Sequence, residues 1–271
     1  MLKQRIITAL IMLPIALCGF FLLEGASFAL FIGVVVTLGA WEWARLAGFT
    51  AQPARVAYAA LVAVLLLLMH LLPALAPWVL GAAALWWLAA TFLVLTYPDT
   101  SAQWSGTACK LVIGLLVLLP AWQGLVLIKQ WPLGNGLILA VMVLVWGADI
   151  GAYFSGKAFG KRKLAPKVSP GKSWEGVFGG LIASLLITAI VGVVRGWSGS
   201  QLLMGLLGAA IVVLISVVGD LTESMFKRQA GIKDSSNLLP GHGGVLDRID
   251  SLTAAIPVFA VLLWAASWGT L

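Results

Sequence analysis

Long apolar runs alternate with short polar segments along the chain. Each run has about 18 residues, the length that an α-helix needs to cross roughly 30 Å of hydrocarbon. The pattern therefore predicts an all-α, polytopic integral membrane protein with one membrane domain. Nine spans are expected, at about residues 6–23, 27–44, 56–72, 78–95, 111–128, 134–152, 176–194, 202–220 and 252–268. Pro73 and Pro77 crowd the junction of the third and fourth runs, which could instead form a tight hairpin.

The basic residues indicate how these spans are oriented. If successive runs cross the membrane in alternate directions, 15 of the 17 Lys and Arg residues fall on one side, and only Lys129 and Arg195 fall on the other. Cytoplasmic loops of membrane proteins collect Lys and Arg. The N-terminus is therefore predicted to be cytoplasmic, and the C-terminus is predicted to lie outside.

The composition agrees with a membrane protein. Hydrophobic residues make up 61% of the chain and charged residues 10%, whereas a soluble domain carries about 25% charged residues. No attached soluble domain is expected. The first run follows Lys3 and Arg5, as in a signal peptide, but its 18 residues exceed the apolar core of about 7–15 residues that signal peptides have. It is therefore expected to remain as the first span.

Acidic residues are unevenly distributed. The first 140 residues contain only Glu24, Glu42 and Asp99, and the remaining 131 contain seven acidic residues. Chemistry is therefore expected in the C-terminal half of the chain. We predict that residues 1–133 form a transmembrane scaffold of about five spans and that residues 134–271 form a catalytic transmembrane region. Two long cytoplasmic loops are expected within the catalytic region, at residues 155–175 and 221–250.

Five of the acidic residues lie near the predicted cytoplasmic surface. Asp220 and Glu223 end the eighth run, Asp247 and Asp250 open the ninth, and Asp149 lies near the end of the sixth. Residues at i and i+3 share a helix face, so two acidic pairs are predicted at the same depth, joined by one loop. Carboxylates near a membrane interior are costly unless they are paired or bind a metal, which makes these residues functional candidates.

Two explanations of these acids remain open. They could form ion pairs, Asp247 with Lys227 or Asp250 with Arg228, and the dipole at a helix N-terminus would also favour Asp250. Alternatively, they bind Mg²⁺, which takes one or two carboxylates and completes its shell with water and substrate phosphate. The nearby Lys and Arg side chains suit phosphate oxygens, and a metal with cations is typical of phosphoryl or nucleotidyl transfer.

The second loop ends in the glycine-rich sequence PGHGG. Gly241, Gly243 and Gly244 would let backbone N–H groups approach an anion directly before a helix N-terminus. His242 lies between these glycines. It could donate to a phosphate or transfer a proton, or it could serve loop structure.

The first loop contains the sequence KVSPGKSWEG. Lys172 and Ser173 are similar to part of a P-loop, but Pro166 stands where that motif needs Gly. Ser169 and Lys172 are candidates for binding the nucleotide or its phosphates. Ser173 is either such a ligand or the N-cap of the next helix. Attraction of the basic loop to anionic lipid head groups is a further alternative.

The segment SMFKRQAGIKDSSNLLPGHGGVLDRID, residues 224–250, resembles the signature of phosphatidate cytidylyltransferases, also called CDP-diacylglycerol synthases. It contains the family's Ser, Lys-Arg, Lys-Asp, Pro-Gly-His-Gly-Gly and Asp-Arg-hydrophobic-Asp elements in order. GDLTES from Gly219 and SPGKSWEG from Ser169 also resemble family elements, so the resemblance covers about residues 146–250. Ile150 departs from the pattern, since many relatives have Thr or Ser there, and this weakens any role for a hydroxyl at that position.

The resemblance implies the reaction CTP + phosphatidate → CDP-diacylglycerol + diphosphate. It implies Mg²⁺ as cofactor, with room for a second, monovalent or divalent, cation. It also implies a homodimer in a bacterial inner membrane, with the active site facing the cytoplasm. CTP, phosphatidate and the lipid bilayer are the expected partners, and no nucleic acid is expected.

Residue roles follow from the matching positions. The expected catalytic residues are Asp220, Asp247, Lys227, Asp250 and His242. Asp220 and Asp247 would hold the metal, with Asp250 and Asp149 assisting. The expected substrate-binding residues are Ser169, Lys172, Ser173, Arg228, Lys233, Gly243, Gly244 and Arg248.

Other function classes make different demands on the chain. A CTP-dependent polyprenol or phytol kinase would also pair CTP with a membrane lipid, but it would release CDP and a lipid phosphate. A transporter of an anion or a phosphorylated lipid would place its site near the bilayer midplane, with internal repeats. The polar residues here gather at one surface and no repeat is visible, which favours an enzyme.

Overall fold

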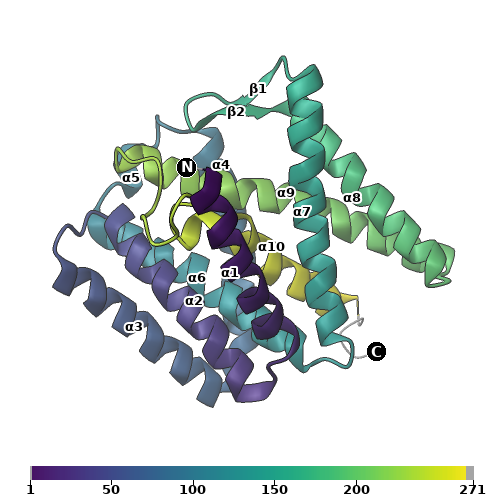
Figure 1. Cartoon of the computed structure of the whole chain (residues 1–271), viewed down its shortest axis with the longest axis horizontal. Coiled ribbons are helices and arrows are strands. Elements are labelled where there is room, and N and C mark those ends of the chain that lie inside the picture. Colours follow the sequence, from purple (N-terminus) through teal and green to yellow (C-terminus); the bar gives the residue numbers. More distant parts are fainter. Residues whose placement is uncertain (1, 267–271) are drawn as a thin grey trace.

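The computed structural model describes residues 2–266, and nine long helices in it correspond to the nine predicted runs (Figure 1). Their bounds are α1 Leu2–Phe21, α2 Gly25–Leu46, α3 Gln52–Leu71, α4 Ala76–Leu95, α6 Thr107–Gln130, α7 Gly134–Phe159, α8 Trp174–Val194, α9 Gly199–Gln229 and α10 Leu246–Ala265; α5, Ser101–Trp104, is a single turn. Eight are long and apolar enough to cross a membrane, and the apolar part of α1, Ile6–Phe21, is shorter. The all-α membrane architecture is confirmed. Residues 267 and 268 of the predicted ninth span lie outside the described residues.

The third and fourth runs form two separate helices. α3 ends at Leu71, the 3-10 turn η1 (Pro73–Leu75) follows, and α4 begins at Ala76. Pro77 lies in the first turn of α4, where a missing N–H removes no helical hydrogen bond. The tight-hairpin alternative is wrong, because both prolines fall at the starts of helical segments.

Two helices extend farther than the apolar pattern predicts. α7 continues to Phe159 and α9 to Gln229, so both enter segments that were expected to be loops. The rest of the first loop forms an antiparallel hairpin, β1 (Lys163–Ala165) with β2 (Ser169–Ser173). Apolarity marks where a helix leaves the membrane, whereas backbone conformation decides where it stops. After α9 the chain turns at Gly231, whose φ of 69° lies in the left-handed region.

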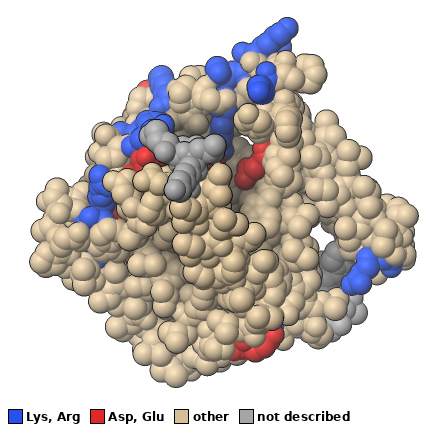
Figure 2. Space-filling model, in the orientation of Figure 1, with Lys and Arg blue, Asp and Glu red and all other residues tan. Residues whose placement is uncertain are grey.

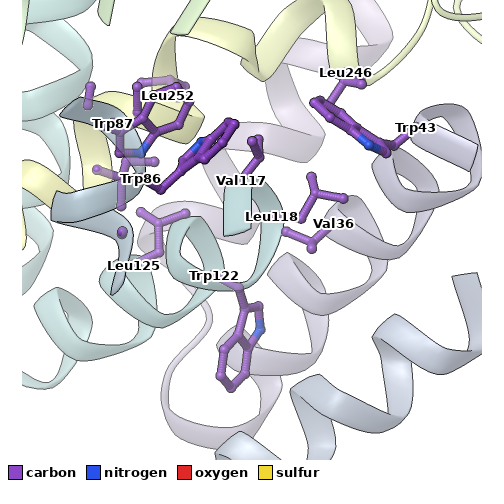
Figure 3. Close-up of a cluster of buried hydrophobic side chains, with 14 of the residues drawn as sticks. Val36, Trp43, Trp86, Trp87, Val117, Leu118, Trp122, Leu125, Leu246 and Leu252 are labelled. Atoms are coloured by element: carbon purple, nitrogen blue, oxygen red, sulfur yellow. The ribbon is translucent and has the colours of Figure 1, made fainter. Parts of the chain in front are cut away.

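The hydrophobic core lies between α2, α4, α6 and α10, where tryptophans pack against aliphatic side chains (Figure 3). α6 is central, because 67% of its most apolar stretch is buried. Two indole groups tie α2 to α6: Trp43 Nε1 donates to Lys110 O at 2.7 Å, and Trp122 Nε1 donates to Ala29 O at 2.9 Å. These bonds satisfy buried donors and fix α2 against the centre of the bundle.

Small residues bring α7 and α8 into close contact. A Cβ on Gly151 would lie 2.7 Å from Gly179 O, and one on Gly180 would lie 2.5 Å from Ala148 O. Glycines spaced in this way let two membrane helices approach backbone to backbone. Outward-facing side chains of α8, such as Phe178 and Ile190, are exposed and apolar, as expected for contact with lipid.

One end of the molecule is polar. The hairpin, α5 and the start of α1 lie at this end (Figure 1), and Figure 2 shows Lys and Arg atoms gathered along it. At the other end of α6, Lys129 Nζ lies 3.3 Å from Glu24 Oε1. The protein is therefore an integral membrane protein with most of its charge at one end of the helices.

Candidate functional site

A cleft of about 380 Å³ lies between α7, α8, α9 and β2. Asp149, Lys172 and Asp220 line its polar part, and Val213 and Val217 of α9 line an apolar part. Val213 lies seven residues before Asp220, or about 10 Å along the helix axis. The cleft therefore runs from charged groups toward an apolar interior. Figure 2 shows a hollow with acidic atoms beside it, below the basic end.

The first loop contributes to this cleft through its second strand. Lys172 Nζ lies 2.5 Å from Asp220 Oδ2, which joins β2 to α9, and Ser224 Oγ donates to Asp220 Oδ1 at 3.3 Å. The Ser173 hydroxyl accepts from Gly176 N at 3.2 Å, so Ser173 is the N-cap of α8, one of the two roles predicted for it. Ser169 is half-buried at the start of β2.

A buried ionic network lies beside the cleft. Lys227 Nζ is 3.0 Å from Glu223 Oε1 and 2.7 Å from Asp247 Oδ1. Asp247 Oδ2 accepts three further hydrogen bonds, from Ser235 N and Ser235 Oγ at 2.9 Å each and from Gly244 N at 2.7 Å. The predicted ion pair between Asp247 and Lys227 is confirmed, and both oxygens of Asp247 are engaged.

The acidic residues of α7, α9 and α10 lie close to one another. A Cβ on Gly219 would lie 2.7 Å from Asp250 O, so α9 and α10 touch at this level. The carboxylate of Asp250 interacts electrostatically with Asp220, and that of Asp149 interacts with both Lys172 and Asp220. The structure thus brings together acids separated by up to 101 positions, Asp149 and Asp250, around two lysines.

Other predicted residues lie around this centre with different contacts. Arg228 Nε donates to Val168 O at 3.1 Å, so the alternative pairing of Arg228 with Asp250 is wrong: the arginine fixes the hairpin backbone instead. Lys233 and Arg248 are exposed. His242 N donates to Leu239 O at 2.8 Å in the PGHGG turn.

The PGHGG turn has the backbone geometry that its glycines allow. Gly241 and Gly243 have φ values of 76° and 84°, in the left-handed region. A Cβ on Gly244 would lie 2.0 Å from Ser235 Oγ, so no other residue fits there. The Nδ1 atom of His242 is buried and has no hydrogen-bond partner among the described residues.

The acids suit Mg²⁺ chemically, although lysines accompany them. Within residues 2–266 no three His, Cys, Asp or Glu side chains are arranged as a preformed metal site. Mg²⁺ needs only one or two carboxylates when substrate phosphates and water supply its other ligands. Asp149 and Asp220 line the same cleft, so these two carboxylates are enough for that requirement.

Sequence reasoning missed several participating residues. Glu42 of α2 is fully buried and accepts hydrogen bonds from the second loop, and Arg45 Nη1 donates to Ser235 O at 3.1 Å. Ser224 and Ser235 contact Asp220 and Asp247 respectively. A glutamate within an apolar run was a signal for Glu42, but its partners lie about 200 positions away.

Comparisons with known proteins agree with this architecture. Residues 3–266 match the model of the cytidylyltransferase family. The chain is 76% identical over 269 residues to a phosphatidate cytidylyltransferase of Pseudomonas aeruginosa, with 99% of each chain covered. It is 43% identical over 286 residues to the Haemophilus influenzae protein of that name, covering 96% of this chain and 98% of the relative. A Staphylococcus saprophyticus phosphatidate cytidylyltransferase matches over a shorter stretch of 126 residues, at 43% identity and covering 46% of this chain and 48% of the relative. With a family match that spans nearly all of its length, the chain belongs to the cytidylyltransferase family.

Proposed function

We propose that this protein transfers the cytidylyl group of CTP to phosphatidate, forming CDP-diacylglycerol and releasing diphosphate. One observation carries the proposal: 76% identity, from end to end, to a protein named phosphatidate cytidylyltransferase. The cleft supports it, because charged groups and an apolar wall line the same space.

The chemistry needs no covalent intermediate on the enzyme. An oxygen of the phosphatidate phosphate attacks the α-phosphorus of CTP and forms a new P–O bond. The bond from that phosphorus to the oxygen bridging to the β-phosphorus breaks, and diphosphate leaves with the electron pair. The protein's task is to position two phosphates and to compensate their negative charge.

The cleft suits one substrate from each phase. Lys172 and Lys157 can meet a triphosphate that arrives from water, while Val213 and Val217 continue toward the interior of the bundle and suit a lipid. We infer that the polar end faces the cytoplasm of a bacterial inner membrane, because cytoplasmic loops collect Lys and Arg. We also propose that two copies of this chain form a homodimer.

Asp220 and Asp247 would hold Mg²⁺, with Asp250 and Asp149 assisting, and a second cation could share these ligands. The bound metal would withdraw charge from the phosphate oxygens. Each of the two principal acids is paired with a lysine, Lys172 or Lys227. Lys172 and Lys227 would also compensate the negative charge of the substrate phosphates.

Further basic side chains would complete the triphosphate site. Lys233 and Arg248 are exposed and can reach substrate phosphates without breaking an internal contact, whereas Arg228 would act while holding the hairpin. The nucleotide would be approached by the backbone of Gly243 and Gly244 and by the hydroxyl of Ser169. His242 would orient a phosphate oxygen.

The test uses detergent-purified protein, phosphatidate, Mg²⁺ and CTP labelled in either the α- or the γ-phosphate. The proposed reaction puts α-label into the lipid phase and γ-label into diphosphate. A lipid kinase would put γ-label into a lipid alcohol acceptor and produce CDP. Absence of any turnover by folded protein would contradict cytidylyl transfer and favour transport.

A further inference from the structure

A fully buried carboxylate lies outside the cleft, near the end of α2. Glu42 has an exposed fraction of 0%. Its Oε1 accepts from Ser236 Oγ at 2.5 Å and from Val245 N at 3.0 Å. Its Oε2 accepts from Leu246 N at 2.6 Å and from Ser235 Oγ at 3.3 Å. Three of the donors belong to the polar segment between α9 and α10, and the fourth, Leu246 N, is the first amide of α10. One side chain of the N-terminal half therefore binds both this segment and the start of α10.

Glu42 caps a helix that has no cap of its own. Val245 is the N-cap of α10, and its side chain makes no capping hydrogen bond. The first amides of a helix lack partners within it and carry partial positive charge, so a carboxylate at this point satisfies them and is favoured by the helix dipole. Here the carboxylate comes from α2 and accepts from the amides of Val245 and Leu246. The start of α10 is therefore fixed against α2.

Asp247 follows directly after these amides. Its Oδ2 accepts from Ser235 N, Ser235 Oγ and Gly244 N, so Asp247 and Glu42 hold the same short loop from two sides. Ser235 Oγ lies within reach of both carboxylates, at 2.9 Å from Asp247 and 3.3 Å from Glu42. The close approach of these groups leaves no room for a side chain at Gly244.

Neighbouring residues of α2 strengthen the same contact. Arg45 Nη1 donates to Ser235 O at 3.1 Å. The ring of Trp43 packs 4.9 Å from the ring of Phe226, which directly precedes Lys227 in α9. The end of α2 thus contacts both helices whose side chains form the Lys227–Asp247 ion pair.

We propose that Glu42 is a positioning residue for the reaction: it places Asp247 by capping α10 and by holding residues 235–245 of the loop against α2. The inference rests on the proposed function, because Asp247 is the group that it positions. Glu42 itself lies behind the loop and is not expected to touch substrate. Small displacements of a group that acts on the reacting phosphates reduce turnover strongly, since a misplacement of about 1 Å can lower a rate about 100-fold.

Glu42→Gln is the direct test, with Glu24→Gln as the matched control. Glutamine has one acceptor oxygen for four donors, and its NH2 group faces two of them. Glu24 is also a glutamate of the N-terminal half, but its side chain is 67% exposed and pairs with Lys129 at the opposite end. Ser236→Ala is a milder second variant, because it removes one donor to Glu42 and leaves every contact of Asp247 in place.

The measurements are turnover per folded molecule, the KM for phosphatidate, and the Mg²⁺ concentration that gives half-maximal activity. We expect Glu42→Gln to lower kcat about 10- to 100-fold and to raise the Mg²⁺ requirement, with the KM for phosphatidate unchanged. Ser236→Ala should shift kcat and the Mg²⁺ requirement in the same direction by a smaller factor. Glu24→Gln should match the wild type.

A purely structural role for Glu42 would lower the folded fraction and leave the kinetics of the folded molecules unchanged. That result, or wild-type kinetics in Glu42→Gln, would overturn the proposal. If Glu42→Gln does not fold, Ser236→Ala decides by the same criteria. If the wild-type protein transfers no cytidylyl group, the proposed function fails, and amide hydrogen exchange tests the positioning separately. The positioning role is supported if the amides of residues 235–247 exchange faster in Glu42→Gln than in Glu24→Gln. Equal exchange in the two variants overturns it.

Discussion

Two lysines hold acidic residues of the site in different surroundings. The Lys172–Asp220 pair lies at the cleft, with side chains 26% and 27% exposed. Lys227 lies between Glu223 and Asp247, where the three side chains are 12%, 3% and 5% exposed. The first pair can separate in the presence of water and substrate at small energetic cost, whereas removing one member of the second leaves a buried charge. We therefore expect the pairing of Asp247 to contribute more to the stability of the fold than the pairing of Asp220.

Asp247→Asn should have the largest effect. Asparagine cannot hold Lys227 as an ion pair and cannot accept with both former oxygens. We expect activity to fall at least about 100-fold and stability to fall by about 3–5 kcal/mol, with the fold retained at low temperature. The checks are the transfer assay, thermal unfolding in detergent and gel filtration. Asp234→Asn, an exposed acid of the same loop, is the control, and an active Asp247→Asn enzyme with unchanged Mg²⁺ dependence contradicts the metal assignment.

Asp220→Asn should separate activity from stability. Activity should fall at least about 100-fold, because the variant lacks a carboxylate that we propose as a metal ligand. The free energy of unfolding should change by no more than about 1 kcal/mol, because the partly exposed pair with Lys172 contributes little. The same assay and unfolding measurement apply, with Asp99→Asn as an exposed control. A loss of stability equal to that of Asp247→Asn would remove the distinction between the two networks.

Lys172→Met should mainly weaken nucleotide binding. A charge-assisted hydrogen bond to phosphate contributes about 1.5–3 kcal/mol, so the KM for CTP should rise about 10- to 100-fold. Thermal stability should stay near that of the wild type. Steady-state kinetics with varied CTP measure the change, and Lys167→Met, exposed in the turn of the same hairpin, is the control. If KM is unchanged, Lys172 serves only to neutralise Asp220.

Arg228→Lys should have the smallest effect. Lysine keeps the positive charge but lacks the Nε donor that reaches Val168 O. Looser attachment of the hairpin should lower kcat/KM for CTP about 3- to 10-fold, in line with the loss of one hydrogen bond of about 1 kcal/mol. Limited trypsin digestion at the hairpin lysines should be faster. Wild-type kinetics and digestion would mean that the charge of Arg228 alone matters.

Sequence patterns were sufficient for the membrane helices and for local contacts. Runs of apolar residues locate the nine long helices of residues 2–266, eight of which are long and apolar enough to cross hydrocarbon. The cap at Ser173 and the Lys227–Asp247 pair were also predictable, since each follows from local spacing or from charges at two adjoining helix ends. The ends of α7 and α9 were not predictable from apolarity, because polar residues can continue a helix beyond the membrane in the same backbone conformation.

Long-range contacts to backbone groups lie beyond such patterns. Arg228 was expected to pair with a carboxylate, but it donates to the carbonyl of Val168, which no side-chain pattern reveals. Glu42 lies about 200 positions in the sequence from the two amides that donate hydrogen bonds to it. Its location in an apolar helix marked it as costly, but only the packing of α2 against α10 identifies its partners.

The most direct test of cytidylyl transfer compares the label that α-labelled CTP places in lipid with the diphosphate released. Wild-type and Asp220→Asn proteins are compared at equal concentrations of folded protein, with phosphatidate and Mg²⁺. Cytidylyl transfer at this cleft should give one diphosphate for each labelled lipid in the wild type, and almost none of either product in the variant. Wild-type rates in Asp220→Asn, or CDP in place of diphosphate, would contradict cytidylyl transfer at this cleft.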